Sequence, residues 1–91
     1  MPELIQEYKN QVQSSDGVSF TALAYGDLRS DGNWEGWLEF HSRKGIDPIL
    51  RTGRETTQPD KNALAYWASG LELAYLEGAL ERATRAERRE A

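Results

Sequence analysis

The sequence predicts an α+β fold, in which a three-stranded antiparallel meander packs on a long C-terminal helix beside a short N-terminal helix (α-β-β-β-α). Residues 18–28 and 33–42 alternate between apolar and polar side chains on either side of a Ser-Asp-Gly-Asn turn, a pattern typical of a β-hairpin. After Pro59 the chain contains no proline, and its apolar residues recur at spacings of three and four, the period of a helix. A chain of 91 residues forms one small domain, so we assign residues 1–91 to a single unit.

The first segment, Pro2 to Gln13, is predicted to be helical. Proline is tolerated in the opening turn of a helix, and Glu3 would lie near the positive end of the helix dipole. The apolar side of this helix is narrow, with Leu4, Tyr8 and Val12 as its main members.

The length of the hairpin loop decides which side chains of the two strands lie opposite each other. A two-residue turn would pair Leu23 with Phe40, whereas a three-residue loop with Gly32 in the left-handed position would pair Tyr25 with Trp37. We favour the longer loop, because it places small side chains opposite large ones on one face and an aromatic pair on the other.

The rest of the chain is predicted to contain a loop at residues 43–48, a third strand and the long helix. Pro48 is excluded from a central strand, so the third strand is placed at Ile49 to Arg54. The Thr57 hydroxyl is predicted to cap the long helix, which begins at Asp60. We expect the charged end of this helix, residues 82–91, to fray.

The long helix is predicted to carry two apolar stripes on nearly opposite sides. At about 100° per residue, one stripe would face the sheet, and it contains Leu64, Trp67, Ala68, Leu71, Tyr75 and Ala79. The second stripe contains Tyr66, Leu73, Leu76 and Leu80. Either the N-terminal helix or a second protein chain must cover it, and we favour the second chain, most simply another copy.

A row of small residues also lies along this helix. Gly70, Ala74 and Gly78 follow each other at spacings of four. Because glycine weakens a helix interior, the row is predicted to admit bulky side chains from the sheet, namely Trp34, Leu38 or Phe40.

Composition excludes several classes of protein. There is no cysteine, no signal-like apolar segment and no run long enough to cross a membrane, so we expect a soluble cytoplasmic protein. The formal net charge of −4 opposes non-specific attraction to nucleic acid.

One face of the sheet nevertheless suggests an alternative function. Proteins bind single-stranded nucleic acid with aromatic rings that stack on bases and cations that contact phosphates. The candidate residues for such a face are Tyr25, Trp37, His41, Arg43, Arg51 and Arg54. The α-β-β-β-α order, with Leu4, Glu7 and Tyr8 early in the chain, resembles the double-stranded RNA-binding domain. That family has a lysine cluster at the start of its last helix, where this chain has Pro59-Asp60-Lys61-Asn62-Ala63, so its activity is not carried over.

No motif for catalysis, metal binding or a cofactor emerges from the sequence. His41 is the only histidine, and the acidic residues near the hairpin turn lack the spacing of a calcium loop. The polar run from Thr52 to Gln58 is the best place for a small anion site, next to a helix N-terminus. We therefore predict a small acidic protein-interaction module that is not an enzyme and forms a homodimer through the second stripe.

Overall fold

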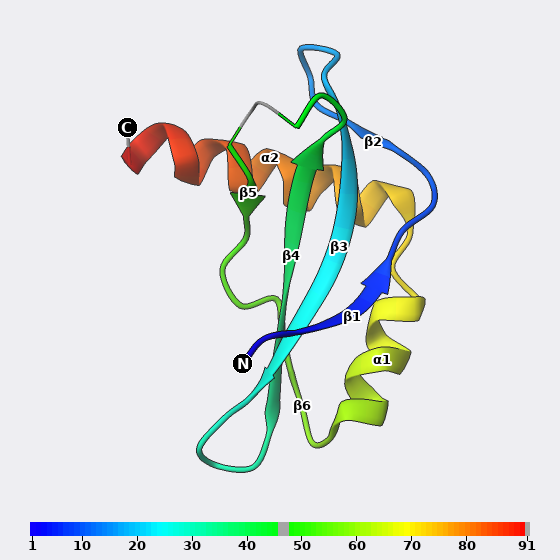
Figure 1. Ribbon diagram of the computed structural model, residues 1–91, viewed down its shortest axis with the longest axis vertical. Coiled ribbons are helices and arrows are strands. Elements are labelled where there is room, and N and C mark those ends of the chain that lie inside the picture. The colour runs from blue at the N-terminus through cyan, green and yellow to red at the C-terminus, as the bar shows by residue number, and fades with distance from the viewer. Residues whose placement is uncertain (46–47, 91) are drawn as a thin grey trace.

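The fold has two layers, an antiparallel sheet and a pair of helices that both lie on one face of it (Figure 1). The structure is a computed structural model that describes residues 1–45 and 48–90. The predicted α+β class and the antiparallel sheet are confirmed. Two residues of the predicted loop at 43–48, Ile46 and Asp47, lie outside the described residues.

The sheet is larger than the predicted three-stranded meander. Within the described residues it contains six strands: β1 (Glu3–Glu7), β2 (Val12–Gln13), β3 (Ser19–Leu28), β4 (Trp34–Ser42), β5 (Leu50–Arg51) and β6 (Thr56–Gln58). The long strands β3 and β4 form the centre. The short strands β1 and β2 both pair with β3, and β5 and β6 both pair with β4, so each edge is made of two short strands in succession.

The predicted hairpin register is confirmed. Tyr25 lies opposite Trp37, and Ala24 lies opposite Leu38. The loop between β3 and β4 holds Gly32 at φ +88°, the left-handed conformation that favours glycine. Small side chains therefore oppose large ones on the face that the helices cover.

The predicted N-terminal helix is wrong, because residues 3–7 and 12–13 form strands β1 and β2. Pairing with β3 provides hydrogen bonds for the backbone N–H and C=O groups of both strands. Burial of Tyr8 and Val12 in the core stabilises this arrangement further. The strand is hard to recognise because its register shifts between Leu4 and Gln6, which disrupts the two-residue alternation of a regular strand.

The predicted third strand is also wrong in its bounds. The segment from Ile49 to Arg54 contributes only β5, and β6 follows after a short connection. Thr57 belongs to β6, where it pairs with Glu35, and does not cap the helix. Asp60 is the cap, since its carboxylate accepts a hydrogen bond of 2.8 Å from the Ala63 N–H.

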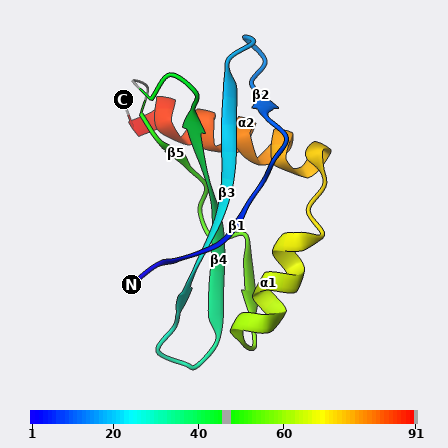
Figure 2. The ribbon, with the colours of Figure 1, turned by 45° about the vertical axis from the view of Figure 1, so that its right-hand side comes forward.

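The single long helix is replaced by two, α1 (Lys61–Ser69) and α2 (Leu73–Glu90), which run in different directions (Figure 2). Gly70 ends α1, and its N–H donates to the Trp67 carbonyl oxygen at 3.2 Å. Glycine is a poor helix former and terminates helices readily, so Gly70 is a natural break point. The break lets α1 contact β1, β4 and β6 while α2 contacts β2 and β5.

Contrary to the prediction, the glycines of the two helices do not pack against bulky side chains of the sheet. A side chain at Gly70 would meet only backbone of α1, and one at Gly78 would meet only the Arg82 side chain. Instead, two glycines of the sheet make room for a bulky side chain of a helix. Gly26 and Gly36 pair across β3 and β4, and a methyl group at either would overlap the side chain of Leu64 from α1.

Candidate functional site: the open face of the sheet

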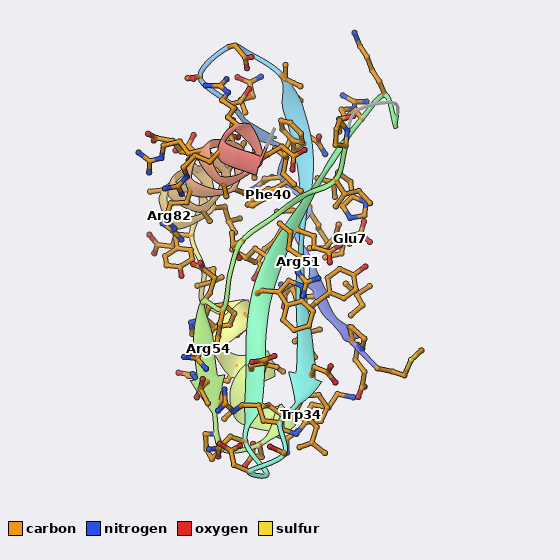
Figure 3. The ribbon with its side chains drawn as sticks, turned by 90° about the vertical axis from the view of Figure 1, so that its left-hand side faces the viewer. Glu7, Trp34, Phe40, Arg51, Arg54 and Arg82 are labelled. Atoms are coloured by element: carbon orange, nitrogen blue, oxygen red, sulfur yellow. The ribbon has the colours of Figure 1, made fainter. Side chains whose placement is uncertain are left out.

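The helices leave one face of the sheet uncovered, and this open face is the candidate site (Figure 3). Residues of β3 alternate in burial, and the buried set of Phe20, Ala22 and Ala24 points toward the helices. Their neighbours point the other way. The open face includes Leu4, Glu7, Thr21, Leu23, Tyr25, Asp27, Glu35, Trp37, Glu39, His41 and Arg51.

Trp37 is the centre of the open face, and its ring is closed off by its neighbours. The Tyr25 ring stacks beside it with centroids 6.4 Å apart and planes at 16°. The Arg51 guanidinium lies 4.4 Å from the ring centroid, a cation–π contact. Only 4% of Trp37 is exposed, although no helix covers it. The side chains of neighbouring strands therefore bury this tryptophan.

A carboxylate connects the tryptophan to the histidine. The Trp37 indole N–H donates to Glu39 Oε2 at 3.3 Å, and Glu39 Oε1 lies 3.3 Å from His41 Nε2. The Glu39 side chain is mostly covered. Among the described residues, Glu39 is the side chain that the His41 ring contacts, and this contact holds the two side chains together on the open face.

The structure brings together four of the six residues predicted for a ligand or nucleic-acid face. Tyr25, Trp37 and His41 lie on the open face with Arg51 above the tryptophan. Arg43 lies in the turn after β4, where it lines a separate hollow. Arg54 points to the helix side of the sheet, away from Arg51 (Figure 3).

The predicted interaction stripe does not exist as one surface. Leu76 and Leu80 are buried in the chain's own core, with 3% and 1% of their surface exposed. Tyr66 and Leu73 are exposed, by 82% and 45%, but they belong to different helices. The interpretation of a single stripe depended on one continuous helix, and the break at Gly70 separates its two halves.

Sequence reasoning missed the contribution of β1 to the open face. Leu4 pairs with Tyr25 and Glu7 pairs with Leu23, which places both on this face. Half of the Leu4 surface is exposed there. Because residues 2–13 fit a helical spacing, no signal in the sequence placed Leu4 or Glu7 beside Tyr25.

The polar run from Thr52 to Gln58 is structural. Thr52 is buried, and its hydroxyl accepts a hydrogen bond of 3.0 Å from the Leu38 N–H. The Glu55 carboxylate accepts hydrogen bonds of 2.5 Å from the Tyr75 hydroxyl and from Arg82. Burial, together with Glu55, raises the pKa of Tyr75. These contacts fasten α2 to the segment before β6 and leave no open anion site at Glu55.

A groove of about 430 Å³ lies between the β2–β3 turn and α2, apart from the open face. Its charged lining contains both signs, with Asp16 and Glu77 facing the same space as Arg85 and Arg88. Mixed charge does not select an anionic or a cationic ligand, so this groove defines no ligand class.

Comparisons with known proteins found no family model, no curated protein and no solved structure that matches this chain. In residues 1–45 and 48–90, neither helix has the length and apolar character needed to span a membrane.

Proposed function

We propose that this protein is a small interaction module that associates with itself through the open face of its sheet. The module is acidic and cytoplasmic and is not an enzyme, as the sequence predicts, but its interface lies on the sheet and not on the C-terminal helix. One observation carries it: the helices cover only one face of the sheet, and the other face exposes apolar and paired charged side chains.

The apolar groups of this face lie together on β1, β3 and β4, and Leu4 is the most exposed of them. Leu4 and Tyr25 form a cross-strand pair, and Tyr25 pairs in turn with the buried Trp37. Leu23 lies next to them on the same face. Apolar side chains at the middle of a patch with charged groups around it are the arrangement found in protein interfaces.

The contacts of the open face argue against nucleic acid as the partner. Base stacking needs a free aromatic face, but Arg51 and Tyr25 already cover Trp37. The cations Arg43 and Arg54 do not join Arg51 to form a phosphate track. Acidic side chains outnumber arginines on the open face, which would repel phosphate.

Replacement of Leu23 by lysine tests the proposal. Leu23→Lys introduces a charge in the middle of the open face, which a second copy could bury only at high cost. We expect the wild-type protein to form dimers in sedimentation velocity, with a Kd on the order of 10–100 µM, and the variant to remain monomeric over the same concentration range.

The matched control is Leu73→Lys, the same substitution at an exposed leucine of α2. It should leave the dimer unchanged, and circular dichroism should show that both variants are folded. A wild-type protein that stays monomeric at about 500 µM, well above the expected Kd, would refute the proposal. Dissociation by Leu73→Lys but not by Leu23→Lys would return the interface to the helix.

A further inference from the structure

We propose that two copies stack their open faces about a two-fold axis that runs parallel to the strands, so that Glu7 of each copy pairs with Arg51 of the other. This inference rests on the proposed self-association and specifies its geometry. It assigns the occupant of the open face as a second copy of the same chain, and Glu7 and Arg51 as the residues that set its orientation.

The charges at the two edges of the sheet are opposite and lie in one row. Glu7 of β1 pairs with Leu23, Leu23 pairs with Glu39, and Glu39 pairs with Arg51 of β5. Four strands at about 4.8 Å spacing place the two ends of this row roughly 14 Å apart. Glu7 and Arg51 of one chain therefore cannot meet. Among residues 1–45 and 48–90, neither makes an ion pair.

When two sheets stack with their strands aligned, a two-fold dimer has two choices of axis in the plane of the interface, along the strands or across them. In such a dimer, a residue that contacts a second residue of the other copy is contacted in the same way in return. An axis across the strands would place Glu7 against Glu7 and Arg51 against Arg51. An axis along the strands, between β3 and β4, reverses the edges and places Glu7 of one copy against Arg51 of the other. Like charges at an interface oppose association, so the charge pattern selects the second axis.

The other acidic residues of the open face already have partners. Asp27 lies 3.5 Å from the N-terminal amine, and Glu35 lies 3.6 Å from Arg29. Glu39 accepts the Trp37 indole N–H. Glu7 and Arg51 are both exposed, and their charges are the ones left for a partner to neutralise.

The size of the face fits a weak dimer. The central strands β3 and β4 are nine to ten residues long, and short strands lie along each edge. At about 4.8 Å between strands and about 3.3 Å per residue, the face is at most roughly 19 by 30 Å. The area is at most about 600 Å² per copy, below the ~800 Å² per partner of a standard stable interface. Sheets that stack face to face lie about 10 Å apart, a gap that glutamate and arginine side chains can bridge from both sides.

Charge reversal with complementary mixing tests this geometry. In Glu7→Arg both cross-copy pairs become Arg with Arg, and in Arg51→Glu both become Glu with Glu. Each variant alone should dimerise at least about tenfold more weakly than the wild type. A one-to-one mixture should recover dimers within about threefold of the wild-type Kd, because the mixed dimer restores both opposite-charge pairs.

The controls are charge reversals of equal size away from the open face. Arg54→Glu lies on the helix side and Glu72→Arg lies between α1 and α2, and neither should change the wild-type Kd. Sedimentation velocity measures the wild type, the four variants and the one-to-one mixture, and circular dichroism checks that each protein is folded.

The outcomes separate the orientation from self-association. Weak dimers of both single variants with recovery on mixing support the orientation. A wild-type dimer that Leu23→Lys dissociates but that does not respond to either charge reversal overturns the orientation and leaves the open face as the interface. If both single variants dimerise more weakly and their mixture does not recover dimers, the proposed orientation is also overturned. A monomeric wild-type protein overturns the proposed function itself.

Discussion

At the scale of single residues, the best-defined buried polar group is Tyr8. Its hydroxyl donates a hydrogen bond of 2.6 Å to the carbonyl oxygen of Ala68 at the end of α1. Burial, with a smaller contribution from Tyr75, raises the pKa of Tyr8 to about 12. The neutral phenol therefore fastens the connection between β1 and β2 to α1.

This raised pKa predicts a loss of stability at alkaline pH. The folded state holds the proton more tightly than the unfolded state, whose tyrosine has a pKa near 10. The contribution is complete below about pH 10 and is lost as the pH rises toward 12, by about 2–3 kcal/mol in total. Urea unfolding measured between about pH 9 and pH 12 checks it.

Tyr8→Phe separates the titration from the hydrogen bond. The variant should be less stable at neutral pH by about 1–3 kcal/mol, because the buried Ala68 carbonyl loses its donor. Its stability should fall less steeply above about pH 10, with the remaining slope due to Tyr75 and other groups. An unchanged alkaline slope in Tyr8→Phe would show that Tyr8 is not the titrating group.

At the scale of elements, the docking of α1 on the sheet depends on the paired glycines Gly26 and Gly36. Both lie opposite Leu64, a fully buried residue of α1. A methyl group at Gly36 would overlap Leu64 and would also lie 3.2 Å from the Thr56 methyl carbon. The pair forms a hollow that allows the helix to approach the strands closely.

Gly36→Ala is expected to destabilise the fold by about 1–3 kcal/mol through overpacking. Leu64→Ala should cost about 2–5 kcal/mol, and the double variant should cost less than the sum, because the smaller residue at 64 removes the overlap. Gly53→Ala is the control, since a methyl group there meets nothing and the cost should be within about 0.5 kcal/mol of zero. Strictly additive costs in the double variant would contradict the account of the hollow.

The elements also show why some of the fold was predictable from the sequence and some was not. The β3–β4 hairpin and its register followed from a short turn sequence and local alternation, which are properties of neighbouring residues. Strand β1 was not predictable, because its register shift disrupts the alternation and its pairing partner lies about twenty residues away. Gly70 signals the break between α1 and α2, but the helical spacing continues across it, so the sequence alone does not distinguish a helix end from a packing residue.

At the scale of the whole molecule, the distribution of exposed apolar residues depends on long-range pairing. The break between α1 and α2 divides the second apolar stripe of the predicted helix, so that Leu76 and Leu80 are buried in the core while Tyr66 and Leu73 stay exposed on separate helices. The open face combines β1, β3, β4 and β5, and the local sequence of the hairpin is enough to place Tyr25, Trp37 and His41 on one face. The sites of Leu4 and Glu7 on the same surface required the complete sheet.

The most direct test of self-association through the open face is a dilution series followed by backbone amide NMR. The amide signals of Leu4, Leu23 and Tyr25 should shift or broaden between about 20 µM and 500 µM, because this range spans the expected Kd. The signals of Tyr66 and Leu73 on the helices should stay constant. Constant signals on the open face together with shifts on the helices, or no change anywhere, would contradict the account.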